Sequence, residues 1–191
     1  MNTTVRITSR LLTTFAALLT LFTFDAAAAA NSCELQIASA ARKHGVPIGI
    51  LYSVGLAETG RKGSLHPFAL NIEGEAVFAR DINEALEAFH RARAEGRKLI
   101  DLGCMQINHY YHRGEFADLR SMLDPAKNVE YAARFLAELR RRHNTWTMAV
   151  ARYHAGPHND PAQKRYVCRV ISNLVATGYG RWTEQAKAFC R

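Results

Sequence analysis

The sequence of 191 residues lacks internal repeats, low-complexity stretches after Ala30 and any linker that would separate two domains. Its four cysteines form no Cys-x-x-Cys pair and show no cysteine and histidine spacing typical of a zinc site. With 48% hydrophobic and 22% charged residues, the composition excludes a disordered polymer and a collagen-like fibre. What remains is one ordinary globular domain with a formal net charge of +8.

Long apolar runs are also missing, apart from one near the N-terminus. Leu11–Phe24 contains no charge, follows Arg6 and Arg10, and leads towards Ala26–Ala30. A basic start, a short apolar centre and small residues before a cleavage site are the three parts of a secretory signal peptide. We therefore predict that residues 1–30 form a cleaved leader.

Two alternatives to a cleaved leader are weaker. A membrane-spanning helix needs roughly 20 apolar residues, whereas this run has 14. A lipid anchor at Cys33 lacks the leucine expected before it. Cleavage removes two arginines and one aspartate, so the mature domain, residues 31–191, keeps 161 residues and a net charge of +7. We expect a basic periplasmic protein without a stable membrane anchor.

All four cysteines lie in the mature domain, which suits the disulfides of an exported protein. Four cysteines allow three pairings, and the sequence alone does not choose among them. We favour Cys168 with Cys190, which are close in the chain, and this leaves Cys33 for Cys104. A domain of this size buries a core unaided, so the bridges are expected to reinforce it.

The apolar spacing predicts a mainly helical domain. Periods of three and four residues, bounded by capping residues, predict helices over approximately 33–43, 47–59, 81–95, 124–142, 145–155, 160–177 and 181–190. Branched and aromatic residues on both sides of Glu73 and Gly74 predict a small β-hairpin over 67–79. We expect 104–112 to form one or two helical turns.

Glu58 is the first candidate for chemistry. It lies seven residues after Leu51 and four after Val54, on the inward stripe of the second helix. Burial and the negative end of the helix dipole both favour the protonated form of a carboxyl group, which a general acid needs at neutral pH. Spacing alone, however, favours a frayed helix end at which Glu58 reaches solvent.

Four sequence motifs, in a fixed order, favour the catalytic interpretation of Glu58 over the solvent-exposed one. They are ETG (58–60), GCMQIN (103–108), DPAKNV (124–129) and AVARYHAGP (149–157). Together they resemble the lytic transglycosylases of peptidoglycan, from about Cys33 to Gly180. The segments ALNIEG, IDLGCMQIN and RYHAG are similar to those of the small enzymes associated with type IV secretion, conjugation and pilus machines.

The resemblance implies a lysozyme-like α+β fold, mainly α, with a glycan-binding groove and no cofactor. It implies cleavage of the MurNAc–GlcNAc β-1,4 bond, with Glu58 as the single catalytic acid and base. Such a residue protonates the glycosidic oxygen and then takes the proton of the muramic C6 hydroxyl as that oxygen attacks C1, which leaves a 1,6-anhydro end. Ordinary glycosidases instead need two carboxylates.

The resemblance also assigns residues around the substrate. Met105, Gln106 and Asn108 match the groove-lining motif and are expected to pack on, or hydrogen-bond, the sugar and its N-acetyl group. A core role is the alternative for Met105 and Ile107, whereas a polar amide between two apolar residues needs a partner. Tyr153 matches the tyrosine that hydrogen-bonds the catalytic carboxyl group, and simple packing is its alternative.

Two departures from the family pattern stand out. His154 occupies a position that often holds asparagine, and it adds a titratable group beside Tyr153. A serine common between the glutamate and the Met-Gln motif has no clear match. The histidines lack acidic or cysteine partners at a metal-binding spacing, so we expect no metal at His109, His112, His154 or His158.

Other charged residues leave two alternative functions open. Glu73, Glu75 or Asp101 could supply a second carboxylate for a lysozyme-type hydrolase, although turn and connector positions favour solvated charges. A non-catalytic glycan-binding assembly protein is the other alternative. Basic runs at Arg91–Lys98 and Arg140–His143 are typical of solvated helix ends and suit attraction to anionic peptidoglycan. The predicted export and the lack of a nucleic-acid-binding motif argue against nucleic acid as a partner.

Overall fold

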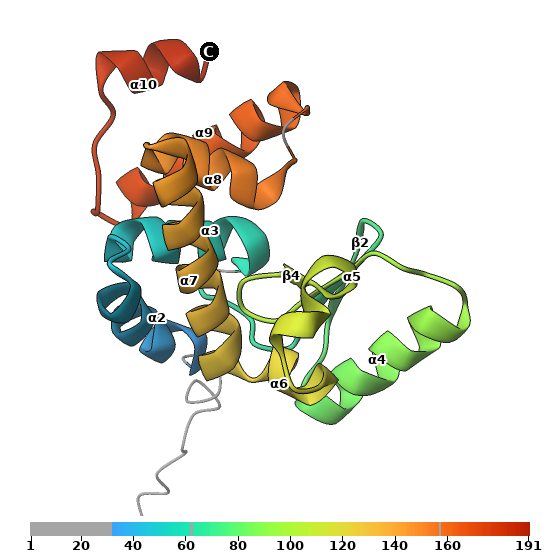
Figure 1. Cartoon of the computed structure of the whole chain (residues 1–191). Coiled ribbons are helices and arrows are strands. Elements are labelled where there is room, and N and C mark those ends of the chain that lie inside the picture. The colour runs from blue at the N-terminus through green and yellow to red at the C-terminus, as the bar shows by residue number, and fades with distance from the viewer. Residues whose placement is uncertain (1–31, 62, 157) are drawn as a thin grey trace, which may run out of the picture.

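The computed structural model describes residues 32–61, 63–156 and 158–191, which form two groups of elements (Figure 1). The predicted leader, residues 1–30, lies outside the described residues, and its cleavage stays a prediction. The helical lobe contains α2 Ser32–His44, α3 Ile48–Thr59, α7 Pro125–His143, α8 Trp146–His154, α9 Asp160–Ala176 and α10 Glu184–Phe189. The smaller lobe contains α4 Ile82–Ala94, α5 His109–His112, the 3-10 turn η1 Arg113–Glu115, α6 Leu119–Leu123 and a sheet.

The sheet has four antiparallel strands in the order β2-β1-β3-β4. They are β1 Ala69–Ile72, β2 Glu75–Phe78, β3 Ile100–Leu102 and β4 Ile107–Asn108. The predicted hairpin is confirmed, and its turn places Glu73 and Gly74 at φ 53° and 100°, as a tight hairpin turn requires. Of the one or two helical turns expected within 104–112, one is present as α5, and the residues before it enter the sheet, where Ile107 pairs with Leu102.

The predicted mainly helical fold is confirmed, and the helix starts show why. Asp81, Asp124 and Thr145 each accept a hydrogen bond from the backbone of the first turn of their helix, which satisfies donors that have no partner within the helix. The short helix α6 was not predicted; it begins at a capping box between Asp118 and Ser121. In the described part of the chain, no helix is long and apolar enough to cross a membrane.

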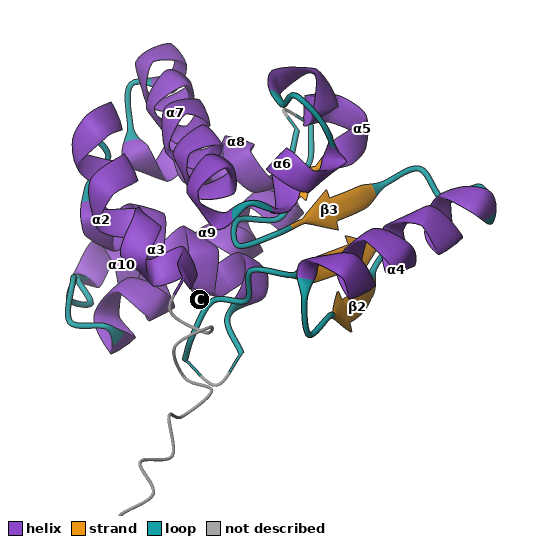
Figure 2. Ribbon diagram, turned by 90° about the horizontal axis from the view of Figure 1, so that it is seen from below, coloured by secondary structure: helices purple, strands orange, loops and turns teal. Residues whose placement is uncertain are grey.

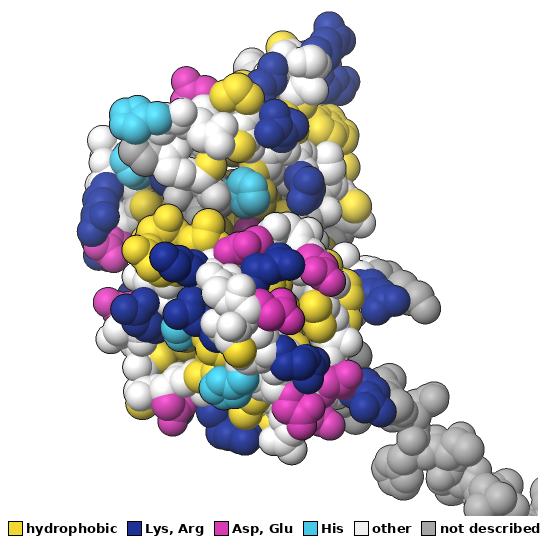
Figure 3. Space-filling view, turned by 90° about the vertical axis from the view of Figure 1, so that its right-hand side faces the viewer, with side chains coloured by type: hydrophobic (Ala, Val, Ile, Leu, Met, Phe, Trp, Pro, Cys, Tyr) yellow, Lys and Arg dark blue, Asp and Glu magenta, His cyan; other side chains and the backbone are white. Residues whose placement is uncertain are grey.

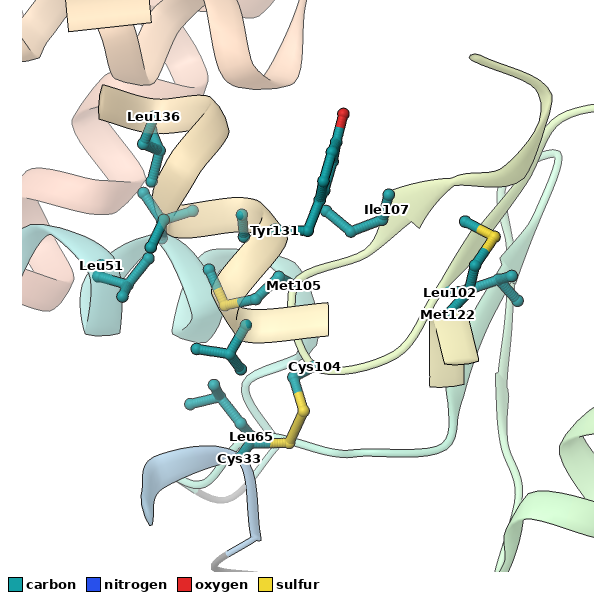
Figure 4. Packing of buried hydrophobic residues seen from close by; sticks show 14 of the residues in the cluster. Cys33, Leu51, Leu65, Leu102, Cys104, Met105, Ile107, Met122, Tyr131 and Leu136 are labelled. Atoms are coloured by element: carbon teal, nitrogen blue, oxygen red, sulfur yellow. A yellow bond between two sulfur atoms is a disulfide. The ribbon is translucent and has the colours of Figure 1, made fainter. Parts of the chain in front are cut away.

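Helix α7 runs through the centre of the helical lobe. It packs against α2 and α8, and α3 packs against α9. Val129, Ala132 and Leu136 of α7 are fully buried and form one face of the helix, as the apolar spacing over 124–142 predicts. Figure 4 shows Leu136 and Leu51 in this lobe and Leu102 beside Met122 in the other. The apolar core therefore continues from one lobe into the other.

Both favoured disulfides are present. Cys33 is joined to Cys104, with a Cα–Cα distance of 5.8 Å, and Cys168 to Cys190, at 5.6 Å. The first ties α2 to the segment between β3 and β4 (Figure 4), and the second ties α10 to α9. The first bridge thus connects the two lobes at the base of the GCMQIN segment.

We predict that the two bridges differ in their contribution to stability. The Cys33–Cys104 bridge closes a 71-residue separation and both its cysteines are fully buried, whereas Cys168–Cys190 closes 22 residues and holds only a short terminal helix. Replacing Cys33 and Cys104 with alanine should lower the unfolding free energy by about 4 kcal/mol, and the other pair should cost about 1 kcal/mol less. Urea unfolding of both double variants measures this, and equal or reversed losses would contradict it.

Candidate active site

A groove of about 960 Å³ lies between the two lobes. One wall comes from the β1–β2 hairpin, β3, β4 and α5, and the other from the end of α3 together with α7 and α8. Figure 2 shows these two sets of elements on different sides of the molecule, with the sheet and α4 set apart from the helices. A long polymer that binds here contacts both lobes.

Glu58 lies in the last turn of α3 and lines this groove. Only 13% of its side chain is exposed, so the inward position predicted from the helical stripe is confirmed. The helix approaches the core closely at Gly55, where a Cβ atom would lie only 2.6 Å from Leu65 and 3.1 Å from the sulfur of Met105. This close packing fixes the end of α3 against the GCMQIN segment.

The Glu58 carboxyl group is hydrogen-bonded by a tyrosine of α9. Tyr166 Oη donates to Glu58 Oε1 at 2.5 Å. Burial, and then the negative charge of Glu58, raise the pKa of Tyr166 well above its usual value, so the phenol stays protonated and remains a donor. His154 stacks on the Tyr166 ring with centroids 4.1 Å apart, and its Nδ1 lies 3.8 Å from Glu58 Oε1.

Tyr153 does not make the hydrogen bond that we expected. Its hydroxyl donates to the backbone oxygen of Met105 at 2.8 Å, although its ring lines the groove beside Glu58. The expectation that Tyr153 binds the Glu58 carboxyl group was therefore wrong, and Tyr166 makes that contact. The physical reason is that a phenol has one proton to donate, and the Met105 carbonyl receives it.

The Met105 side chain does not reach the sugar site. It is fully buried and fills the space beneath Gly55 of α3, so the expected packing on the sugar was wrong for this residue and the core alternative was right. Its backbone has the more direct role. The Met105 N–H donates to Asn128 Oδ1 at 2.9 Å, and its carbonyl accepts from Tyr153.

All four sequence motifs meet around this backbone. Thr59 of the ETG motif donates from Oγ1 to the Cys104 carbonyl at 2.8 Å. Asn128 of the DPAKNV motif also donates from Nδ2 to the carbonyls of Leu102 and Met122, at 2.9 and 2.8 Å. Tyr153 supplies the contact from the fourth motif. The motifs are thus parts of one hydrogen-bonded support for the groove wall.

Gln106 and Asn108 both line the groove, as predicted. Gln106 Nε2 donates to the carbonyls of Ala69 and Gly103, each at 3.1 Å, which gives its amide the partners that the sequence required. Its backbone has a φ of 47°, which is uncommon for a residue other than glycine. Asn108 Oδ1 caps α5, and its Nδ2 donates to Asp101 Oδ1 at 2.7 Å.

Asp101 is a second carboxyl group in the groove. It lies on β3 and lines the same cavity as Glu58. Burial is the main cause that raises the pKa of Asp101 to about 6; the Glu58 charge adds to the increase, while the hydrogen bond from Asn108 opposes it. Our expectation of a solvated charge was wrong for Asp101, because its connector is a sheet strand. Glu73 and Glu75 are exposed, which agrees with that expectation, and Glu73 also lines the groove at the hairpin turn.

The other sequence candidates lie apart from Glu58. His112 lines the groove and its Nδ1 lies 2.7 Å from the Tyr131 hydroxyl, while His109 packs edge-on against Phe89. His158 is exposed. Among the described residues, no group of three histidine, cysteine, aspartate or glutamate side chains could hold a metal ion.

Sequence reasoning missed Tyr166 and Asn128. Tyr166 lies four residues before Val170 on the buried face of α9, so the helical period is a signal that it faces inward but does not show which group it contacts. Asn128 lies on the buried face of α7, and a buried amide next to a helix start is a signal for a backbone-binding role.

Comparison with protein-family models matches residues 68–173 to the transglycosylase SLT domain. The chain belongs to the SLT transglycosylase family. Because this family comprises lytic transglycosylases that act on peptidoglycan, the protein is a peptidoglycan lytic transglycosylase. The match includes the last three motifs, and Glu58 precedes it. Searches of curated proteins and of solved structures gave no match.

We predict that Asp101→Asn stabilises the transglycosylase at high pH. The pKa of Asp101 is about 6 when folded, against 3.8 for an unperturbed aspartate, so ionisation of this group lowers the unfolding free energy as the pH rises from about 4 to about 6. The substitution should raise the unfolding free energy by about 1–3 kcal/mol at pH 8 and leave it unchanged at pH 4.

Urea unfolding at the two pH values measures the effect. Asp118→Asn is the control, because hydrogen bonds from Ser121 hold the pKa of Asp118 below its usual value and its ionisation therefore stabilises the fold. This control should lose stability at pH 8. A gain for Asp101→Asn that is the same at pH 4 and pH 8 would contradict the proposed cause.

Proposed function

We propose that Glu58 is the catalytic acid and base of this transglycosylase and that its products carry 1,6-anhydromuramic ends. The proton of the Glu58 carboxyl group goes to the glycosidic oxygen as the bond from that oxygen to C1 of the muramic residue breaks. The C6 hydroxyl oxygen of the same residue then bonds to C1, and its proton returns to Glu58. No water is consumed, so one carboxyl group suffices.

The single observation that carries this proposal is the position of Glu58. It is an acidic side chain of a largely apolar helix, almost enclosed, yet lining the groove between the lobes. Tyr166 holds Oε1, and Oε2 has no hydrogen-bond partner among the described residues. One oxygen therefore orients the group while the other is left for proton transfer, which is the arrangement that a positioned general acid needs.

We further propose that the enzyme acts in the periplasm, where it opens the wall locally for a type IV secretion, conjugation or pilus apparatus. Two disulfides support an oxidising compartment, and the N-terminal sequence supports export. Lys and Arg side chains are spread over the face seen in Figure 3, with Asp and Glu between them. The positive net charge favours association with an anionic wall.

Asp101 favours one second candidate reaction, hydrolysis of the same bond. A second carboxyl group in the groove could activate water or stabilise positive charge at C1, as in glycosidases with two carboxylates. Its hydrogen bond with Asn108 fixes its orientation in the wall opposite α3. Water attack would give a reducing end in place of an anhydro end.

We predict that Glu58→Gln abolishes release of muropeptides from purified sacculi, because glutamine keeps the shape of the side chain but has no acidic proton to transfer. The mature wild-type protein should release fragments with anhydro ends, which mass spectrometry distinguishes from reducing ends by the mass of one water. Unchanged thermal unfolding is the control for folding. A fully active Glu58→Gln variant would refute the assignment, and reducing ends would establish the hydrolytic candidate.

We also predict that Tyr166→Phe and Tyr153→Phe separate orientation of Glu58 from support of the groove wall. Tyr166→Phe removes the donor to the Glu58 carboxyl group and should lower kcat by about 10- to 100-fold with little change in KM, since a hydrogen bond to a charged group contributes about 1.5–3 kcal/mol. Tyr153→Phe removes only the donor to the Met105 carbonyl and should mainly lower stability. Steady-state turnover of soluble glycan strands measures both variants, and a larger kcat loss for Tyr153→Phe would reverse the assignment.

A further inference from the structure

Arg152 is a cation in the groove that the proposed chemistry does not use. It lies in α8 immediately before Tyr153 and lines the groove together with Glu58. Its Nε and Nη1 atoms are buried, and neither has a hydrogen-bond partner among the described residues. Within that part of the chain no carboxylate forms an ion pair with it either. Such an uncompensated cation is unusual, because buried charges are normally paired.

An arginine does not avoid the cost of an unpaired buried charge by becoming neutral. A guanidinium group stays protonated at any pH at which the protein is folded. Among the described residues, three carboxyl groups line the groove, and each is engaged elsewhere. Glu58 accepts from Tyr166, Asp101 accepts from Asn108, and Glu73 accepts from the backbone N–H of Lys98. The groove therefore offers a positive charge whose partner has to come from outside the described chain.

We propose that Arg152 binds a carboxylate of the peptidoglycan substrate, which makes it a specificity-determining residue of the groove. The inference rests on the proposed function of this groove in binding glycan strands. A planar guanidinium with several N–H donors matches a carboxylate better than it matches any neutral sugar hydroxyl. Arg152 lines the groove, and its Nε and Nη1 atoms have no partner in the described chain, so its guanidinium group is placed to meet a ligand bound there.

Peptidoglycan carries carboxylates at two places. GlcNAc units carry no charge, whereas a muramic residue carries a free lactyl carboxylate where its peptide has been removed, and a stem peptide carries carboxylates of its own. Both sources present the same planar anion close to the muramic residue whose bond is cleaved. A strand of GlcNAc alone lacks this anion, so Arg152 discriminates peptidoglycan from a neutral polymer with the same β-1,4 linkage.

The test compares matched ligands in the Glu58→Gln protein, which leaves the glycan uncut. The first pair is a GlcNAc–MurNAc tetrasaccharide with free lactyl carboxylates and the same tetrasaccharide with lactyl carboxamides. The second pair carries stem peptides with free or amidated carboxyl groups. Calorimetry at low salt gives a Kd for each ligand, and we expect the carboxylate form of one pair to bind at least about tenfold more tightly.

Variants assign the preference to Arg152. Arg152→Gln should reduce the ratio of the two Kd values to near one, and Arg152→Lys should retain part of it. Arg141→Gln, which removes the same charge from an exposed site on α7, should retain it in full. A purely structural role would change stability, or change both Kd values together, and leave the ratio intact.

The outcomes are decisive even if Arg152→Gln fails to fold. A preference in the first pair identifies the lactyl carboxylate, and a preference in the second identifies the stem peptide. Equal Kd values within both pairs for the Glu58→Gln protein overturn the proposal without any further variant, as does a ratio that survives in folded Arg152→Gln. Cleavage of sacculi by the wild-type protein tests the proposed function separately, so either can fail alone.

Discussion

The backbone at Cys104 and Met105 is held from several directions, and both walls of the groove depend on it. Thr59 of α3 binds the Cys104 carbonyl, Asn128 of α7 binds the Met105 N–H, and Tyr153 of α8 binds the Met105 carbonyl. A disulfide to α2 fixes the same segment. Four helices of one lobe are thereby connected to the loop from which the sheet strands β3 and β4 of the other lobe diverge. A shift at this loop would move Asp101 relative to Glu58.

Loss of any of these hydrogen bonds should lower the stability of the fold, because the groups that make them are buried. An unmade hydrogen bond of a buried group costs about 1–3 kcal/mol, and bonds in one network strengthen one another. The network also explains the unusual backbone at Gln106, whose positive φ persists because its amide is tied to the Ala69 and Gly103 carbonyls. At Gly103, a Cβ atom would lie 2.7 Å from the Asn128 side chain, so only glycine allows that side chain to reach the loop.

Features that depend on neighbouring residues could be predicted from the sequence, and features that depend on distant ones could not. Helix starts and the turn at Glu73 and Gly74 follow from capping and backbone preference, which act within a few residues. The helical period put Glu58 on the inward stripe, but the ordered motifs were needed to favour that position over a solvent-exposed helix end. Tyr166 lies 108 positions from the carboxyl group that it contacts. The helical period predicts that Tyr166 faces inward but not which group it meets. Asp101 was misjudged for the same reason, since its burial comes from strand pairing that a three-residue segment does not reveal.

Two residues of the groove break the usual rules of stability. Asp101 is held where its charged form is disfavoured, and Arg152 has buried donors without partners. Sites that bind and act on a ligand are expected to carry such unsatisfied groups, because the bound ligand supplies the hydrogen bonds or the opposite charge that the protein itself does not. A neutral groove of the same shape would be more stable but would hold a chitin-like strand as well as peptidoglycan. In our proposal, the stability lost at Arg152 is the physical basis of substrate choice, just as the enclosure of Glu58 is the basis of proton transfer.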